Sequence, residues 1–376
     1  MAKDIVLPTS LPGEINAATR TLHTTLNRQI TTRLPLALPP HASDPALYTT
    51  GLLHYTPVFL TFESLWTDLC LASSNDVVSP HLSYLLVNPY SSPTLFSSPP
   101  SGPLLTFLST LRPHGLARST RLKHDLSTLL GVSATEVDVL LTQYPGPLVR
   151  DFCLHIRRSV AAKPHVLVAY AWCFYMAVFS GGRWIRGELV KAGEEFWVHR
   201  VRDGQGTDTQ GKEGKGQEEQ SEEEMTQRKK SDWGLNFWYF AGEFDGEDIK
   251  VEFKRRLAAA ESLFTPSERV DIIEEAKTIF KFSASLVEGL DEQLGTDMEK
   301  VKRLDTMSRL RAKAEEKQKR ETATENRKQQ DNLFQKAGDA VMWFRRPEVT
   351  GMLVAVGCLV CVLLLRLDPV SVFEGI

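Results

Sequence analysis

The chain has 376 residues, of which 42% are hydrophobic and 24% are charged, a balance typical of a folded protein. Its formal net charge of −3 gives no basis for nucleic-acid binding, and we expect no such partner. The 5 cysteines form an odd, scattered set, which argues against a disulfide framework and fits a reducing compartment. The amino-terminal segment has no apolar run behind a basic stretch, so it does not resemble a secretory signal, and we expect a cytosolic body.

The apolar residues of the first 150 positions predict helices joined by proline-rich turns. One helix is expected over 14–30, and a second from Tyr48 to about Cys70, where Pro57 should kink or break it. Residues 72–103 are rich in Ser and Pro and are predicted to form mostly loop. Three further helices are expected near 104–111, 117–130 and 134–143.

The densest apolar pattern of the predicted globular part lies in residues 149–192, and no charged residue stands between Val166 and Gly182. A membrane span usually needs about 20 apolar residues, and this run is slightly shorter. It also contains Tyr170, Trp172 and Tyr175. Of the two interpretations, a membrane span or a fully buried core helix, we favour the core helix.

A charged, Gly-rich and Gln-rich segment occupies residues 203–232 and has no large apolar residue except Met225. Such a segment cannot bury enough surface to fold alone. Strong apolar patterns flank it, at Phe196-Trp197 before and at 233–240 after. We therefore interpret it as a disordered insertion within one domain, and the alternative is a linker between two domains.

Two more helices are predicted over 246–262 and 266–294. Thr265, Pro266 and Glu268 have the spacing of a capping box with Pro in the first turn, and Gly295 is a plausible helix end. The following residues are polar and favour helix, so we expect a charged helical stalk over 296–346.

The last apolar run extends from Val349 to Leu365 without a charge. At about 1.5 Å per residue it spans roughly 26 Å, near the thinner end of a bilayer core. Arginines flank both ends, and the positive stalk favours a cytosolic body with a translocated tail. We expect a transmembrane anchor at 347–367 and a short tail at 368–376; the alternative is a buried helix of a larger core. Cys358 and Cys361, although spaced as a CxxC pair, are interpreted as packing residues of the span.

Three separated segments, in the right order, resemble the haem oxygenase family: Ala17–His23, Leu167–Gly182, and Phe264-Thr-Pro followed by Ile273–Phe280. The first is similar to the family's first-helix segment that ends in the proximal haem ligand. The second is similar to its distal helix, and the third to its last core helix. The resemblance covers roughly residues 10–295. It implies an all-α, haem-oxygenase-like helical bundle over residues 1–295, and the family's longer eukaryotic members also end in a membrane segment.

The resemblance implies that His23 coordinates haem iron, which a neutral imidazole can do. His54 is the alternative ligand, because it also lies in an apolar helix. Ser180, Gly181 and Gly182 interrupt an apolar helix, and we assign them to the catalytic region. Two reasons for the glycines stay open: approach of a flat macrocycle to the backbone, or close packing of helices.

Haem carries two propionates, so we expect cations at the mouth of its site. Arg20, one helical turn before His23, is one candidate, and the match to the family places Arg256 in the same role. Lys250, Lys254 and Arg255 surround Arg256, and an ordinary solvated face is the alternative for each of these cations. The resemblance also implies that Tyr175, Phe179 and Phe280 form walls of the haem pocket.

One position departs from the family: Val178 stands where the distal helix usually carries an Asp that organises water for oxygen activation. The resemblance implies oxidative opening of haem to biliverdin, iron and carbon monoxide, with electrons from a membrane-bound NADPH-dependent reductase. Anchoring both proteins in one lipid bilayer would raise their effective concentration. The alternatives are a catalytically silent haem-binding or sensor protein, and a tail-anchored adaptor. The endoplasmic reticulum is the membrane that the resemblance implies, with the mitochondrial outer membrane as the alternative.

Overall fold

The computed structural model describes residues 10–71, 101–198, 233–240 and 242–307, with short helical pieces at 309–310, 313–314 and 317–318. The chain divides into two units, Met1–Val301 and Lys302–Ile376. The predicted insertion 203–232, the anchor 347–367, the tail 368–376 and most of the stalk 296–346 lie outside the described residues.

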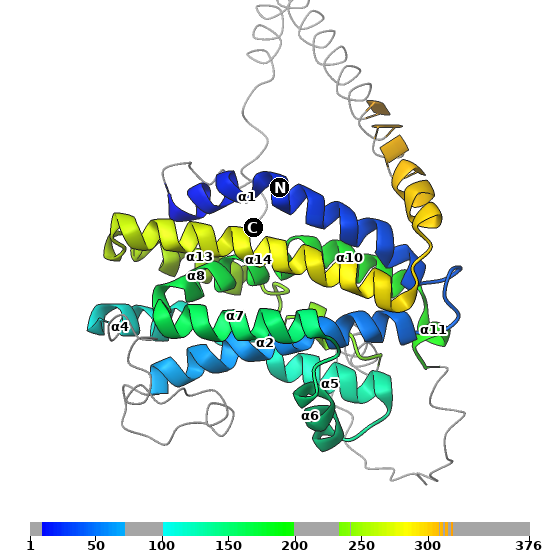
Figure 1. The fold of residues 1–376 in the computed structure, drawn as a ribbon, viewed down its shortest axis with the longest axis horizontal. Coiled ribbons are helices and arrows are strands. Elements are labelled where there is room, and N and C mark those ends of the chain that lie inside the picture. The colour runs from blue at the N-terminus through cyan, green and yellow to red at the C-terminus, as the bar shows by residue number, and fades with distance from the viewer. Residues whose placement is uncertain are drawn as a thin grey trace, which may run out of the picture. The chain divides into compact units, whose positions relative to one another are not determined.

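All regular elements of the described residues are helices, which confirms the all-α prediction (Figure 1). In chain order they are α1 (Leu11–Arg33), α2 (Ala46–Leu71), α4 (Gly102–Leu111), α5 (Ser119–Leu130), α6 (Ala134–Thr142), α7 (Pro147–Ala162), α8 (Leu167–Tyr170), α9 (Met176–Phe179), α10 (Gly181–Lys191), α11 (Glu194–Val198), α13 (Glu247–Ala259) and α14 (Pro266–Leu294). Short turns of 3-10 helix occur at Leu34–Ala37, Pro164–Val166, Asn236–Trp238 and Glu261–Leu263.

Several helix ends follow the predicted signals. Thr265 and Glu268 form a capping box at the start of α14, and Gly295 ends it in the left-handed conformation with φ 58°. α2, in contrast, runs through Pro57 without a break. Its apolar face, including Phe62 and Trp66, is fully buried, and this packing outweighs the lost backbone hydrogen bond.

The apolar run from Val166 to Gly182 lies in a helix that is bent at Ser180. This bent helix comprises Pro164–Phe179 and Gly181–Lys191, which meet at 40°, and it includes a π-helical turn at Ala171–Tyr175. Side chains from Val166 to Ala171 are at most 1% exposed, so this part of the run is a core helix as predicted, whereas Ala177, Ser180 and Gly181 near the bend are exposed. Among the described residues, no single helix is long and apolar enough to cross a membrane, and only this bent pair passes that test of length and composition.

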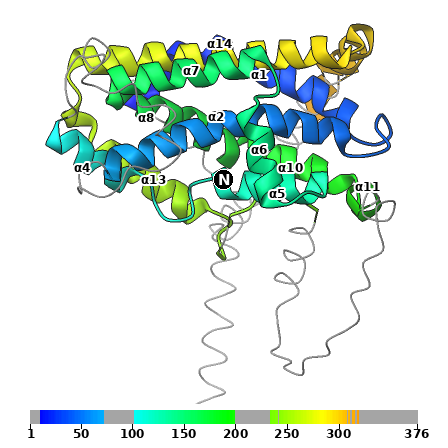
Figure 2. The same ribbon diagram turned by 60° about the horizontal axis from the view of Figure 1, so that its bottom comes forward.

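Three helices of the first unit run in the same direction. Arg269 of α14 pairs with Glu14 of α1 at one end, and Asp291 pairs with Arg33 at the other. The bent helix follows α14 in the same direction, since His165 pairs with Asp271 and Tyr170 donates to Glu275. Figures 1 and 2 show α1 along α14, with α8 and α10 at opposite ends of the bent helix.

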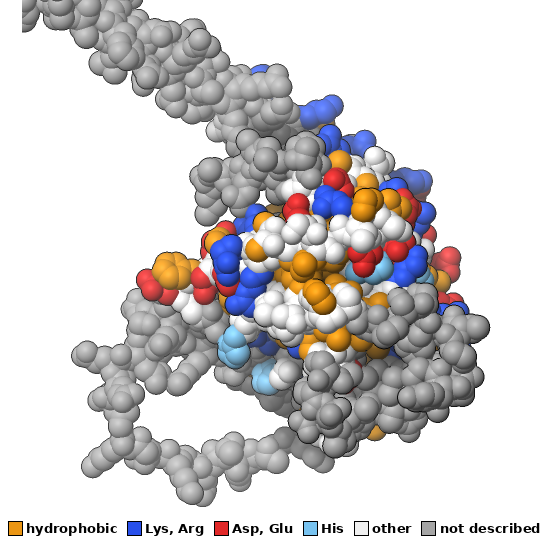
Figure 3. Space-filling view, turned by 90° about the vertical axis from the view of Figure 1, so that its left-hand side faces the viewer, with side chains coloured by type: hydrophobic (Ala, Val, Ile, Leu, Met, Phe, Trp, Pro, Cys, Tyr) orange, Lys and Arg blue, Asp and Glu red, His pale blue; other side chains and the backbone are white. Residues whose placement is uncertain are grey.

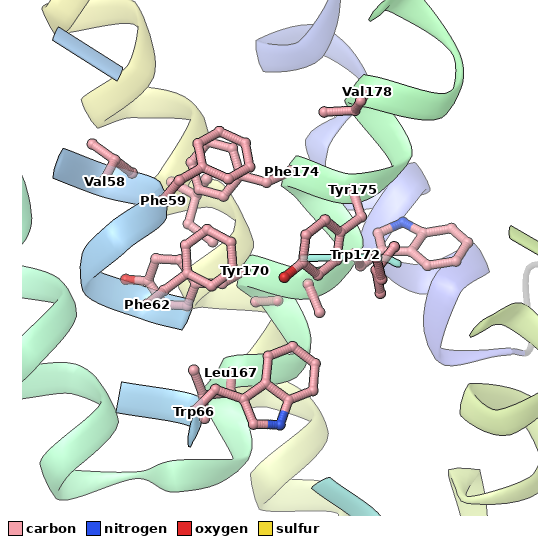
Figure 4. Packing of buried hydrophobic residues seen from close by; sticks show 14 of the residues in the cluster. Val58, Phe59, Phe62, Trp66, Leu167, Tyr170, Trp172, Phe174, Tyr175 and Val178 are labelled. Atoms are coloured by element: carbon pink, nitrogen blue, oxygen red, sulfur yellow. The ribbon is translucent and has the colours of Figure 1, made fainter. Parts of the chain in front are cut away.

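The core centres on aromatic side chains of α2 and the bent helix. Phe62 stacks on Phe174 with ring centroids 5.5 Å apart, and Phe59 lies 5.1 Å from Phe174 (Figure 4). On the face shown in Figure 3, acidic and basic side chains are interspersed around apolar ones. The fold therefore combines a tightly packed aromatic interior with a surface on which acidic and basic side chains mix.

Candidate haem-binding site

α1 and the bent helix meet where the Trp172 indole Nε1 donates a hydrogen bond of 3.0 Å to Asn16 Oδ1. His23 follows Asn16 by seven residues, and Ser180 follows Trp172 by eight. At 1.5 Å per residue these steps advance about 11 Å and 12 Å along helices that run in the same direction. His23 therefore lies at the level of the bend at Ser180.

Both helices carry exposed residues at this height along their axes. Arg20 and His23 follow Asn16 by four and seven residues, so they share the face that meets the bent helix. On the bent helix the exposed residues also follow helical spacing. We call these positions together the open face: Asn16, Arg20, His23, Ala177, Ser180, Gly181 and Trp184.

The imidazole of His23 is available as a ligand. Its side chain is exposed, and its ring meets the edge of Phe280 on α14 with centroids 5.7 Å apart. Within the described parts of the chain, neither ring nitrogen of His23 makes a hydrogen bond. Phe280, predicted as a pocket wall, thus lies beside the predicted ligand and limits how its ring can turn.

The alternative ligand, His54, is differently placed. Its side chain is 4% exposed, its Nδ1 lies 2.8 Å from the Thr50 carbonyl oxygen, and its Nε2 lies 3.0 Å from Gln293 Oε1. Both nitrogens are therefore engaged within the fold, and coordination of iron would require breaking one of these contacts. The structure favours His23 over His54.

The two glycines at the bend have different surroundings, so both interpretations of them find support. A methyl group added at Gly181 would meet no atom within 4 Å, whereas one added at Gly182 would lie 3.0 Å from the Trp238 indole. Gly182 is thus needed for close packing. Gly181 leaves open space beside the backbone, where a flat ligand could approach.

Of the predicted cations, Arg20 is the one that stays free. Its guanidinium is exposed and pairs with no carboxylate among the residues that the structure describes. Arg256 instead pairs with Glu252 at 2.6 Å and donates to the Thr110 carbonyl. The neighbouring cations are also engaged: Lys250 with Glu247, and Arg255 with Glu252. A propionate would therefore compete with an existing partner at Arg256 but not at Arg20.

Tyr175 and Phe179 lie behind the open face, not on it. Both are 1% exposed. The Tyr175 hydroxyl donates to Glu63 at 2.9 Å, and the Phe179 ring stacks on Phe240 at 4.5 Å. The structure therefore places these two predicted pocket walls in the core, because the π-helical turn and the bend direct Ser180 and Gly181 outward instead. Val178 is also buried, at 4% exposure.

A buried polar cluster around Glu275 was not found from the sequence. Glu275 accepts hydrogen bonds from His155 at 2.9 Å, from Ser159 at 2.8 Å and from Tyr170 of the bent helix. Burial alone would raise the pKa of Glu275, but these hydrogen bonds outweigh it and hold the pKa below its ordinary value. The sequence shows Tyr170 and Glu275 only as polar residues inside apolar helical patterns. Helical spacing does not predict which residues of other helices they contact.

This cluster should make stability depend on pH. Because the folded pKa of Glu275 is lowered, its stabilising effect is present above the unfolded value, near 4.5, and is lost as the pH falls through the folded value. We expect Glu275→Gln to lower the free energy of unfolding at pH 7 by roughly 1–3 kcal/mol. Denaturant unfolding at pH 7 and pH 4 should show a smaller gap between variant and wild type at pH 4. An equal gap at both values would contradict this role.

The open face suits a flat, iron-containing macrocycle with carboxylate groups, because it offers a free imidazole, a free guanidinium and a backbone without a side chain at Gly181. The aromatic ring of Phe280 lies beside it. Comparisons with known proteins agree. The sequence profile described as Heme oxygenase matches residues 106–289. The haem-binding protein HMX1 of Saccharomyces cerevisiae is 23% identical over 290 residues, which cover 75% of this chain and 76% of that protein.

Solved structures share the fold. Haem oxygenase 2 from Chlamydomonas reinhardtii, solved without haem, has a TM-score of 0.50 at 16% identity and covers 75% of this chain and 97% of its own. Haem oxygenase-2 from Synechocystis sp. PCC 6803, in complex with haem and NO, has a TM-score of 0.50 at 13% identity and covers 79% and 93%. The protein is an all-helical bundle of the haem oxygenase fold. The matches of sequence and fold together support a haem oxygenase family protein.

Proposed function

We propose that this protein binds haem at the open face, with His23 as the ligand of the iron and Arg20 as a partner of one propionate. The observation that carries the proposal is the exposed, free imidazole of His23 at the level of the open backbone at Gly181. Phe280 would restrain the His23 ring, and Gly181 would allow the macrocycle to lie close to the bent helix. Ser180 is exposed at the same bend.

We further propose that the bound haem is opened to biliverdin, iron and carbon monoxide by a monooxygenase reaction. When bound, haem supplies both the oxygen chemistry and the ring that is cleaved. The protein's own contribution would be to ligate the iron through His23, to orient the ring by pairing Arg20 with a propionate, and to exclude water with the apolar residues behind the bend. Electrons would come from an NADPH-dependent reductase.

A second function is favoured by one observation, the buried Val178. Valine cannot hold a water molecule or pass a proton, so haem could be bound without being opened. The protein would then be a haem-binding or sensor protein. An adaptor that uses the fold without haem is the third function. Titration of the full chain with haem, followed by a turnover assay with reductase, NADPH and oxygen, separates all three.

The proposal includes attachment to a lipid bilayer through residues 347–367, with the helical body in the cytosol. It rests on the apolar run between flanking arginines in the sequence. The endoplasmic reticulum is the proposed membrane by resemblance to the family, with the mitochondrial outer membrane as the alternative. On either membrane, a reductase anchored in the same bilayer would meet this protein at high effective concentration. Fractionation of cells that express the full chain or a chain ending at residue 346 tests this: only the full chain should sediment with membranes.

Gly181→Ala tests the open face directly. Since a methyl group there meets no atom within 4 Å, the free energy of unfolding of the haem-free protein should stay unchanged or rise by up to about 1 kcal/mol. Haem affinity should fall by about tenfold, because the methyl group occupies the space of the ligand. Gly187→Ala is the matched control, since it lies in the same helix with nothing within 4 Å. Equal haem affinity in both variants would place the haem elsewhere.

A further inference from the structure

Residues 233–240 form a short aromatic segment that packs behind the bend of the bent helix. We call these residues the aromatic strap. The side chains that matter most are Phe237, Trp238 and Phe240, which are buried or half-buried in the core. In the sequence this segment is an apolar flank of the charged insertion, and no motif in it indicates a role of its own.

The first contact of the strap with the bent helix is made by Trp238. Its indole ring occupies the space beside Gly182, where a methyl group would lie 3.0 Å from one ring atom and 3.1 Å from the next. The same indole donates a hydrogen bond of 2.8 Å from Nε1 to the hydroxyl of Tyr48 on α2. The hydrogen bond to Tyr48 therefore holds the indole in place, and the indole in turn packs against α10 at Gly182.

The second contact is made by Phe240. Its ring stacks on Phe179 at 4.5 Å, directly before the bend, and the buried guanidinium of Arg118 lies 4.0 Å above its centroid. Arg118 also donates to the strap carbonyls of Phe237 and Tyr239. Trp238 and Phe240 thus contact the helix on both sides of Ser180.

The strap itself is fixed to the core by a buried carboxylate. Asp125 of α5 accepts hydrogen bonds from the backbone N–H groups of Asn236 at 2.8 Å and of Phe237 at 2.6 Å. Arg186 of α10 adds a contact to the Trp238 carbonyl and pairs with Asp245 at 2.6 Å. The strap is therefore hydrogen-bonded to the core and packed in it, unlike a surface loop.

We propose that Trp238 and Phe240 are positioning residues that set the bend at Ser180, and thereby the distance between Gly181 and His23 available to the macrocycle. The proposal rests on the proposed function, since it concerns haem at the open face. Neither residue lies on that face. Each acts through its partner in the bent helix, Trp238 through Gly182 and Phe240 through Phe179.

The test is a size exchange across the contact between strap and helix. Gly182→Ala should push α10 away from Trp238 and speed the release of haem to an excess of an acceptor apoprotein by about tenfold. The double variant Gly182→Ala/Trp238→Phe should bring the rate back to within about threefold of wild type, because phenylalanine lacks the part of the indole that meets the added methyl group. Gly187→Ala is the control with the same chemical change and should release haem at the wild-type rate.

Loss of stability alone cannot give this pattern, because the double variant also loses the hydrogen bond from the indole to Tyr48. The unfolding of each haem-free chain is measured alongside. If Gly182→Ala releases haem at the wild-type rate, or if the double variant stays as fast as the single one, the positioning role is refuted. Should Gly182→Ala fail to fold, Phe240→Leu carries the same expectation of faster release without adding an atom to the bent helix.

The failure of the proposed function is visible separately. A wild-type chain that does not hold haem through His23 would refute the proposed function and this inference together. If the wild-type chain holds haem through His23 and the variants at the strap contact release haem at the wild-type rate, this inference alone is refuted.

Discussion

His23→Ala should abolish the imidazole-ligated spectrum of the haem complex and lower haem affinity by at least about 100-fold. Removal of even an outer partner of a metal ligand typically lowers affinity about 10–100-fold, and here the ligand itself is removed. Because the side chain is exposed, the free energy of unfolding of the haem-free variant should lie within roughly 1 kcal/mol of wild type. The contact with Phe280 is the main interaction lost. Absorption spectra during haem titration, with circular dichroism of the haem-free protein, measure both.

Two other histidines serve as controls for this prediction. His54→Ala should lower stability, since it removes a buried side chain together with its contacts to the half-buried Thr50 and the exposed Gln293, yet it should keep the spectrum of the haem that binds. His114→Ala, at an exposed turn, should change neither property. If the spectrum of His23→Ala matched wild type while that of His54→Ala changed, the iron would be bound by His54.

Local signals predicted much of the fold, because they act within a few residues. The capping box at Thr265 and Glu268, and the left-handed end at Gly295, follow from short-range chemistry. The effect of Pro57 was less predictable from local chemistry, since α2 continues through it. There the burial of a whole helix face decides, and that burial depends on residues far away in the chain.

In the candidate site, too, some features follow from local sequence and others depend on distant residues. His23, Gly181 and Phe280 were named through a resemblance of motifs. The structure brings the rings of His23 and Phe280 together, and helical spacing places Gly181 at the same level. The exposed direction of Ser180 and Gly181 could not be predicted, because a π-helical turn at Ala171–Tyr175 shifts the residues that follow it around the helix axis. Tyr175 and Phe179 for this reason face the core. Partners such as Glu63 for Tyr175, or Trp238 for Gly182, come from distant segments, and helical spacing within one segment carries no information about them.

Val178 should affect the opening of haem but not its binding. It follows Phe174 by four residues and so shares its side of the bent helix, where Phe59 and Phe62 stack. Figure 4 shows Val178 on the side of the helix that carries Phe174. A water molecule would find few partners in such surroundings, because ordered water needs two to four polar groups. We therefore expect wild type to bind haem but to form biliverdin slowly.

Val178→Asp should raise the amount of biliverdin formed per bound haem. Its apolar neighbours would raise the pKa of the introduced carboxyl, so that it stays protonated near neutral pH and can donate a proton. The substitution should also lower the free energy of unfolding by about 1–3 kcal/mol, since a polar group is buried without a prepared partner. Samples must therefore be compared at equal haem occupancy, with Val178→Asn as the control that has nearly the same shape but cannot ionise. Equal, rapid biliverdin formation by wild type and Val178→Asp would show that another group already supplies the proton. If neither protein forms biliverdin while haem stays bound through His23, a haem-binding or sensor function is favoured over an enzyme. The binding site would then be intact, but the bent helix would provide no route for the proton.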